Sequence, residues 1–388
     1  MSLTFDSARI PNPHLTEDHL AWRDALRRFV DKEIMPYAEG WDEAGHIPIA
    51  LWPKAAEVGL LGAGYPEQYG GMETDSWHSW IINEELSRVG VGGLSASLMV
   101  HGIGLPPVIN WGTEAMKAEI APPVLRGESW ISLGITEPGG GSDVASLQTT
   151  AVRDGDHYIV NGSKTYITGG MRANYVSTAV RTGGDGATGV SMLLIPTDAE
   201  GFSRTALDKK MGWWASDTAT LYFDNVRVPV SNLIGQENQG FRVIMTNFNS
   251  ERMGMAAAME AYGRVCLEEA VNWARERQTF GKRLADHQVI RHKIAMMKQK
   301  LNATQAYIRI CYEAIEAGEA NAGDIALLKV QASEVMEFCA REAMQILGGV
   351  GYMRGNRVER IYREVRVNAI GGGSEEIMRD LASRQYGL

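Results

Sequence analysis

The spacing of apolar positions changes twice along the chain and divides it into three regions. In the first region, apolar residues recur at helical intervals between Thr16 and Pro36, namely Leu20, Leu26, Phe29, Val30 and Ile34. Thr16 is followed by Glu17 and Asp18, which is typical of a helix N-terminus with acidic residues in its first turn. Further helices are predicted at residues 51–58 and 76–88.

The middle region has the short, β-branched runs that are typical of strands. Strands are predicted at residues 149–153, 158–160, 175–180, 190–195 and 219–223. The first two flank Asp154-Gly155-Asp156, which indicates a tight hairpin turn. After Gly240 the helical period returns and holds to the end, and Gly348-Gly349 is predicted to end a helix over residues 324–347. The pattern therefore predicts an α+β protein with a helical region at 1–130, a β region at 131–240 and a helical region at 241–388.

Composition excludes several classes of protein. The net charge of −9 and the pI near 5.5 argue against nucleic acid as a partner, because phosphate backbones are bound mainly by Lys and Arg. Three well-separated cysteines, Cys266, Cys311 and Cys339, indicate small core residues in a reducing compartment rather than a disulfide framework. No apolar run approaches bilayer length, so we expect a cytoplasmic protein that neither spans a membrane nor is secreted. His101, His287 and His292 are not spaced as metal ligands, and no metal is expected.

The most informative segment is 135–144, which reads ITEPGGGSDV and places three consecutive glycines among hydroxyl side chains. Glycines leave the main chain bare, which suits a segment that approaches a planar, polar ligand closely. Taken alone, such a run is more often an ordinary surface loop. Four further blocks downstream favour the ligand-binding interpretation.

Together these blocks resemble the acyl-CoA dehydrogenase family, whose flavin-contacting signature reads Thr-Glu-Pro-Gly-x-Gly-Ser-Asp. The four other blocks agree with the family in order and spacing: residues 162–168 (GSKTYIT), 277–282 (RQTFGK) with His287-Gln288, 345–352 (QILGGVGY) and 374–377 (SEEI). The resemblance covers nearly the whole chain. It implies a middle β-barrel or sandwich and a C-terminal four-helix bundle, with FAD held between the β region and the C-terminal helices of two subunits of a homotetramer.

The resemblance also implies which residues contact FAD. In the β region these are Leu133, Ile135, Thr136, Gly141, Ser142, Tyr166, Ile167 and Thr168. In the helical region they are Arg277, Thr279, Phe280, His287, Gln288, Gln345, Leu347, Gly348, Gly349, Ser374 and Glu376. Tyr166 stands where most members have Trp. Neither Gly62-Ala63-Gly64 nor Gly349-Val350-Gly351 follows a strand within a βαβ unit, so a nicotinamide-binding domain is disfavoured.

The chemistry that the resemblance implies is the α,β-dehydrogenation of an acyl-CoA thioester to a trans-2-enoyl-CoA. A carboxylate takes the α-proton, the β-hydrogen leaves as hydride to flavin N5, and hydrogen bonds to the thioester oxygen stabilise the developing charge. Most members carry this base in Tyr-Glu-Gly-Thr-Ser-Glu-Ile. Here residues 371–377 read GGGSEEI, so Gly372 stands in its place and contributes only its main-chain amide.

A minority of the family, the long-chain and isovaleryl-CoA dehydrogenases, carry the carboxylate on a helix just before an arginine. This chain has Glu251-Arg252 at that place, so Glu251 is the predicted base. Apart from the family, Glu251 is most simply a first-turn charge that complements a helix dipole. Glu375 and Glu376 are the rival bases. The predicted substrate contacts are Ser142, Asn249, Arg252 and Gly373.

The sequence leaves the electron acceptor, the acyl chain and the pathway open. Electron-transfer flavoprotein is the acceptor that the resemblance implies. The alternatives are an acyl-CoA oxidase or flavin monooxygenase of the same fold that uses oxygen, and a noncatalytic CoA-binding scaffold.

Overall fold

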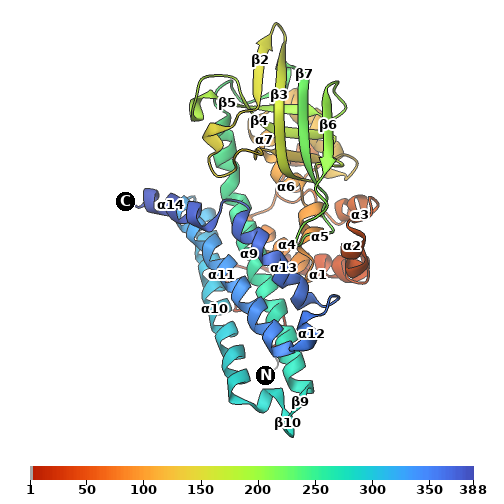
Figure 1. Ribbon diagram of the computed structural model, residues 1–388, viewed down its shortest axis with the longest axis vertical. Coiled ribbons are helices and arrows are strands. Elements are labelled where there is room, and N and C mark those ends of the chain that lie inside the picture. The colour runs from red at the N-terminus through yellow and green to blue at the C-terminus, as the bar shows by residue number, and fades with distance from the viewer. Residues whose placement is uncertain (1–2) are drawn as a thin grey trace. The chain divides into compact units, whose positions relative to one another are not determined.

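The protein was studied as a computed structural model in which residues 3–388 are described. Helices precede and follow a central sheet, which confirms the predicted α+β class (Figure 1). The chain separates into two compact units, a helical unit of residues 3–40, 75–92 and 249–388 and a sheet-bearing unit of residues 41–74 and 93–248. The helical unit therefore combines segments from both ends of the chain.

The helical unit is built on long helices that share one apolar core. Its elements are α1 (Glu17–Phe29), α4 (Ser76–Ser87), α9 (Gly240–Glu276, which begins in the other unit), α10 (Gln288–Glu316), α11 (Ala322–Leu347), α12 (Gly349–Tyr352), α13 (Arg357–Ile370) and α14 (Glu375–Gln385). Val265, Leu301, Leu328 and Ile361, from α9, α10, α11 and α13 in turn, are fully buried in one cluster. This arrangement agrees with the predicted bundle. Cys266, Cys311 and Cys339 are buried free thiols, as predicted.

The helix boundaries follow the predicted signals. The side chain of Thr16 accepts a hydrogen bond from the His19 amide and starts α1, which continues as a π-helix over Val30–Ile34. Helix α11 ends at Leu347, and Gly348 follows with φ +62°. The helical period that is predicted to hold from Gly240 to the end is interrupted by strands that were not predicted, because a small hairpin of β9 (Gln278–Thr279) and β10 (Lys282–Arg283) separates α9 from α10.

The sheet-bearing unit holds an eight-stranded sheet in the order β6-β7-β3-β2-β4-β5-β8, with β1 parallel to β4. The strands are β1 (Ile131–Gly134), β2 (Thr150–Asp154), β3 (His157–Thr168), β4 (Tyr175–Arg181), β5 (Val190–Pro196), β6 (Phe202–Ala206), β7 (Thr218–Pro229) and β8 (Leu233–Ile234). All five predicted strands are present, and Asp154 pairs with His157 across the predicted hairpin turn. Strands β1, β6 and β8 were not predicted, because they are short and lack a clear alternation of apolar residues.

Shorter helices complete the sheet-bearing unit: α3 (Leu51–Glu57), α5 (Gly92–Leu98), α6 (His101–Gly104), α7 (Pro106–Trp111) and α8 (Glu114–Leu125), while α2 (Ala38–Ala44) crosses from the helical unit. Among residues 3–388, no single helix is long and apolar enough to cross a membrane; one bent pair, Gly92–Leu98 with His101–Trp111, reaches that length and apolarity only together.

Candidate functional site

The predicted flavin-contacting segments of the sheet lie side by side. The main chain continues from β1 through Thr136, whose carbonyl oxygen accepts a hydrogen bond of 2.8 Å from the amide of Thr165 on β3. Ile135 is buried and Thr136 is half-buried. The structure therefore brings two blocks together that are separated in the sequence by the glycine loop and β2.

Tyr166 has an unusual backbone and an exposed side chain. Its φ is +60°, a left-handed conformation that residues with a Cβ rarely adopt, and the pairing of β3 with β7 shifts register between Lys164 and Ile167. The side chain is 71% exposed. A strained backbone that presents an aromatic ring outside the sheet is typical of a ligand-contacting position. This geometry suits the predicted aromatic wall beside the flavin.

The glycines of the loop fit a closely bound cofactor. A Cβ added at Gly139 or Gly140 would meet no protein atom within 4 Å, and neither residue has a left-handed φ. Neither the surrounding atoms nor the backbone conformation of this chain therefore requires glycine at these two positions. At Gly141 a Cβ would lie 3.2 Å from Cγ2 of Thr136, and Ser142 is exposed beside it. The result is bare main chain next to hydroxyl groups, which suits the polar groups of FAD.

Glu251 lies well inside α9, eleven residues after its first residue Gly240. The interpretation of Glu251 as a first-turn charge is therefore wrong. The side chain is half-buried, and burial raises its pKa to about 8 against the opposing effect of Arg252. A carboxyl group with a pKa in this range is suited to accept a proton near neutral pH.

Arg252 connects α9 to the loop of residues 371–373, where most members of the family carry the base. Its Nε donates a hydrogen bond of 3.1 Å to the Gly372 carbonyl oxygen, and its Nη1 donates one of 3.3 Å to Oδ1 of Asn249. Gly372 and Gly373 have φ values of +68° and +101°. Arg252, the residue that follows the predicted base, thus joins α9 to the vacated Gly372 position.

A second cation holds the same loop from α11. Lys329 is fully buried, and its Nζ donates hydrogen bonds of 3.1 Å to the Ala369 carbonyl oxygen and 2.8 Å to the Gly373 carbonyl oxygen. Burial lowers the pKa of Lys329 to about 8, against the opposing effect of Glu375. Lys329 was not identified as a site residue from the sequence. Its signal was a lysine between Leu328 and Val330 on an apolar helix face.

The rival carboxylates have other tasks. Glu375 accepts a hydrogen bond of 2.7 Å from Oγ of Ser333. Glu376 is exposed, and bonds from its own amide and from Ser374 lower its pKa, so it remains ionised rather than poised for proton transfer. Ser374 caps α14 by accepting a bond from the Ile377 amide. Of the three carboxylates, Glu251 has the properties that a base requires.

The remaining predicted cofactor residues lie at the opposite end of the helical unit. Exposed Arg277 follows the end of α9, and Phe280 is 96% exposed. The β9–β10 hairpin, between whose strands Phe280 lies, is at the end of α9 (Figure 1). Nε2 of His287 lies 3.2 Å from Oγ1 of Thr279, and Gln288 is exposed. An ion pair between Lys293 and Glu342 holds the start of α10 against the end of α11, where Gln345, Leu347, Gly348 and Gly349 lie. Leu347 itself is buried, whereas Gln345 and both glycines are exposed.

The residues around Glu251 and Gly372 and the residues around Arg277 are too far apart to contact one flavin within one chain. Glu251 and Glu276 are 25 residues apart on the same helix, which corresponds to a distance of roughly 37 Å at about 1.5 Å per residue. An extended FAD molecule is shorter than this. If both groups contact FAD, they contact different FAD molecules.

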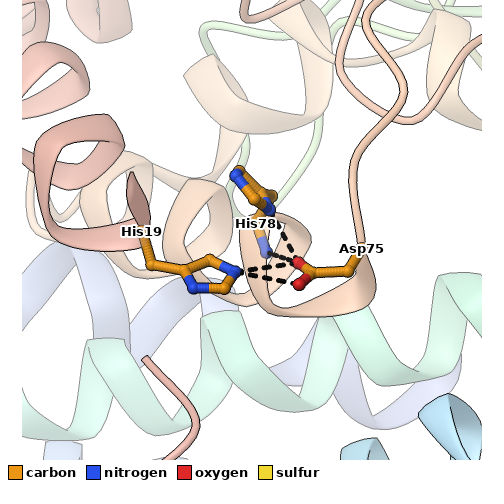
Figure 2. Close-up of side chains that lie close together, drawn as sticks. All are labelled: His19, Asp75 and His78. Atoms are coloured by element: carbon orange, nitrogen blue, oxygen red, sulfur yellow. Dashed lines mark hydrogen bonds and ion pairs between the residues drawn. The ribbon is translucent and has the colours of Figure 1, made fainter. Parts of the chain in front are cut away.

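One cluster of possible metal ligands was not singled out from the sequence. His19, Asp75 and His78 place one ligand atom each within 4.8 Å of one another (Figure 2). Nε2 of His19 and Nδ1 of His78 lie 3.0 Å and 2.6 Å from the Asp75 carboxylate, which also caps α4. Nδ1 of His19 accepts a bond from the Thr16 amide, so the proton of the neutral ring is on Nε2 and points to Asp75. These bonds join the N-termini of α1 and α4, and they account for the cluster without a metal.

Comparison with known proteins agrees with this geometry. Models of the acyl-CoA dehydrogenase N-terminal, middle and C-terminal domains match residues 16–128, 132–226 and 238–387. The acyl-CoA dehydrogenase AFT10-1 of Alternaria alternata is 38% identical over 97% of this chain and 93% of its own length. The mitochondrial long-chain specific acyl-CoA dehydrogenase of Rattus norvegicus is 34% identical over 95% of this chain and 86% of its own.

Solved structures show the same relationship. A probable acyl-CoA dehydrogenase of Mycobacterium abscessus superimposes with a TM-score of 0.94, at 45% identity over 96% of this chain and 99% of that one. A glutaryl-CoA dehydrogenase of Mycobacterium smegmatis in complex with FADH2 gives 0.90, at 27% identity over 96% and 95%. A chain described as the electron transferring flavoprotein of Acidaminococcus fermentans gives 0.91, at 32% identity over 97% and 99%.

The fold and the bare glycine loop beside Tyr166 define a flavin-dependent oxidoreductase. The chain belongs to the acyl-CoA dehydrogenase family, and its cofactor is FAD. Which residues contact FAD and the substrate stays a prediction from the resemblance and from the geometry described above.

The glycine at 372 yields a prediction about stability. A Cβ there would lie 2.8 Å from Sδ of Met255 on a left-handed backbone, so Gly372→Ala is expected to lower the free energy of unfolding by about 1–2 kcal/mol. Chemical denaturation measures this change. Gly184→Ala is the control, because its Cβ would meet nothing within 4 Å and its φ is not left-handed; an equal loss in both variants would contradict the prediction. The same strain opposes a glutamate at 372.

Proposed function

We propose that the protein oxidises an acyl-CoA to a trans-2-enoyl-CoA with Glu251 as the base, and passes the electrons to an electron-transfer flavoprotein. The observation that carries the proposal is Glu251 itself. It is a carboxyl group whose pKa is raised to about 8, next to an arginine that bonds the carbonyl oxygen of Gly372. The family's usual position for the base is vacant in this chain, so the reaction needs a carboxylate from elsewhere.

In the proposed reaction Glu251 accepts the proton from Cα of the thioester. The main-chain amide of Gly372 donates a hydrogen bond to the thioester oxygen, on which negative charge develops as the Cα–H bond breaks. Bound FAD would supply the acceptor for the hydride that leaves Cβ, with formation of the double bond between Cα and Cβ. Both electrons of the broken Cβ–H bond leave with the hydride, and the proton from Cα stays on Glu251.

Two cations, Arg252 and Lys329, contact the loop of residues 371–373 and support this role for the Gly372 amide. Arg252 and Lys329 donate to the carbonyl oxygens of Gly372 and Gly373, and so fix the two peptide groups that directly follow the one bearing the Gly372 amide. Both positive charges therefore lie against the loop whose amide, in this proposal, donates to the developing oxyanion. A donor that is already oriented needs no reorganisation during the reaction, and this is the main source of such stabilisation. Asn249 fixes Arg252 in turn through the bond to its Nη1.

The base assignment predicts the behaviour of Glu251→Gln. This change keeps the size of the side chain and removes its basicity, so the rate of flavin reduction by acyl-CoA should fall by at least about a hundredfold while FAD content remains. Anaerobic stopped-flow absorbance at the flavin band measures the rate. Glu334→Gln, in an exposed pair with Arg379, is the matched control and should reduce at the normal rate. Near-normal reduction by Glu251→Gln would remove Glu251 from the mechanism.

The raised pKa also gives a pH signature. Because the base must be ionised, the reduction rate at low substrate concentration should rise with pH and level off above about 8. The folded protein holds the Glu251 proton more tightly than the unfolded chain, so its stabilising contribution is full below the ordinary glutamate pKa of 4.5 and is lost as pH rises to about 8. Glu251→Gln should therefore unfold at a higher temperature than the wild type at pH 8 but not at pH 4.5. A stability difference independent of pH would contradict the raised pKa.

The distance between Glu251 and the Arg277 end supports a shared site in a homotetramer built as a dimer of dimers. A guanidinium at Arg277 suits the flavin pyrophosphate of a neighbouring subunit, because its planar donors bind two oxygens together. If so, Glu251→Gln and Arg277→Ala chains produced together should form hybrids in which one site carries both changes and the other carries neither. Activity should then exceed that of either variant alone. No complementation, or a monomer in light scattering that holds full FAD, would refute the shared site.

The vacant side-chain position at Gly372 leads us to propose a long or branched acyl substrate, and the long-chain specificity named for the rat relative supports this. A panel of straight, branched and cyclic acyl-CoAs, scored by loss of flavin absorbance without oxygen, tests the proposal. Strict preference for butyryl-CoA would refute it.

Reoxidation of the substrate-reduced protein should be fast with electron-transfer flavoprotein and slow with oxygen, and the reverse result would indicate an oxidase or monooxygenase.

A further inference from the structure

One carboxylate joins the two ends of the glycine loop. The loop occupies residues 138–147, between Glu137 and Gln148. Oε2 of Glu137 accepts a hydrogen bond of 2.6 Å from the Gln148 amide, and Oε1 accepts one of 2.8 Å from the Thr149 amide. The main chain of Glu137 also exchanges two bonds with Gly140, of 3.0 and 3.1 Å. Glu137 therefore closes the loop that carries Gly141 and Ser142.

A buried lysine binds the same carboxylate to the neighbouring strand. Nζ of Lys164 on β3 donates bonds of 2.8 Å to Oε1 of Glu137 and 3.0 Å to the Ile135 carbonyl oxygen. Lys164 is fully buried, and Glu137 is 8% exposed. Lys164 is two residues before Tyr166. The pair thus fixes the loop, the Ile135–Thr136 segment and the strand of Tyr166 as one framework.

Stability alone is a poor explanation for such a pair. Desolvation of two charges offsets most of their attraction, and well-packed apolar residues often stabilise a core equally well. Preorganisation is a better explanation. A loop that is ordered only on binding loses conformational entropy at that moment, and this loss weakens the affinity for the ligand. A loop that is already closed binds without this loss.

We infer that Glu137 and Lys164 are positioning residues that hold the loop in its FAD-binding conformation before the cofactor arrives. The two residues act through main-chain groups of the loop and of Ile135 rather than by contact with the reacting atoms. The inference does not depend on the identity of the base, because it concerns only the affinity for FAD and the order of the loop.

The experiment compares Glu137→Gln and Lys164→Met with a matched control in the full-length protein. The control is Asp154→Asn, which makes the same acid-to-amide change in an exposed ion pair with Arg227. FAD is removed, the dissociation constant for added FAD is measured by fluorescence, and the unfolding temperature of the cofactor-free protein is recorded. Glu137→Gln and Lys164→Met should raise the constant by about tenfold or more, and the control should leave it unchanged. A lower unfolding temperature with unchanged FAD affinity would overturn the inference.

A double variant separates positioning from folding. Glu137→Met with Lys164→Met leaves no unpaired buried charge, so the unfolding temperature should recover toward that of the wild type while FAD affinity stays low. Recovery of both properties would show that the pair acts only through stability and would overturn the inference.

Hydrogen exchange of the unaltered, cofactor-free protein provides a test that needs no variant. The amides of Gln148 and Thr149 should be as protected as those within β3, because Glu137 accepts bonds from both. Exchange of these two amides as fast as that of exposed loop amides would overturn the inference, whatever the variants do.

Discussion

Hydrogen bonds from lysine and arginine side chains to main-chain carbonyl oxygens hold the irregular segments that carry the candidate site. Lys164 donates to the carbonyl oxygen of Ile135, just before the loop of residues 138–147. Lys329 and Arg252 donate to the carbonyl oxygens of Ala369 and Gly372, at the end of α13 and in the loop that follows it. Arg181, at the end of β4, donates to the carbonyl oxygens of Ala145 and Leu147 at 2.6 and 2.9 Å. Irregular segments leave carbonyl groups without the partners that helices and sheets supply, and a buried carbonyl needs a donor. A lysine or arginine provides several donors from one side chain.

Burial has a different consequence for the charge of Glu251. Burial lowers the pKa of Lys164 and of Lys329 to about 8, so both lysines are still mostly charged at pH 7, whereas burial raises the pKa of Glu251 to about 8 and leaves it mostly neutral there. A group that is ionised only with difficulty destabilises the folded chain near neutral pH, and such a conflict between stability and activity is common at functional sites. The well-satisfied loops provide the rigid surroundings that tolerate it.

The fold could be predicted from the sequence, whereas the contacts that organise the candidate site could not. The period of apolar residues was sufficient for α1, α11 and the five predicted strands. The motif of residues 162–168 hid the continuation of β3, because its regular strand pattern is broken by the bulge at Tyr166. Lys164, Lys329 and Glu137 received no role, since a pattern of polarity assigns a charged residue to the surface. Glu251 was identified only because the resemblance drew attention to Gly372, and its position inside α9 corrected the simplest alternative.

Helix α9 acts as a molecular spacer. It carries Glu251 eleven residues after its first residue and is followed by Arg277, with no proline or glycine pair between residues 251 and 276. One inserted or deleted residue in this stretch would turn Arg277 about the helix axis by about 100° and shift it by about 1.5 Å. A surface loop absorbs such a change, but a continuous helix passes it to everything beyond. The length of α9 is therefore subject to a stricter constraint than its exposed side chains: these can vary, whereas the number of residues between Glu251 and Arg277 cannot.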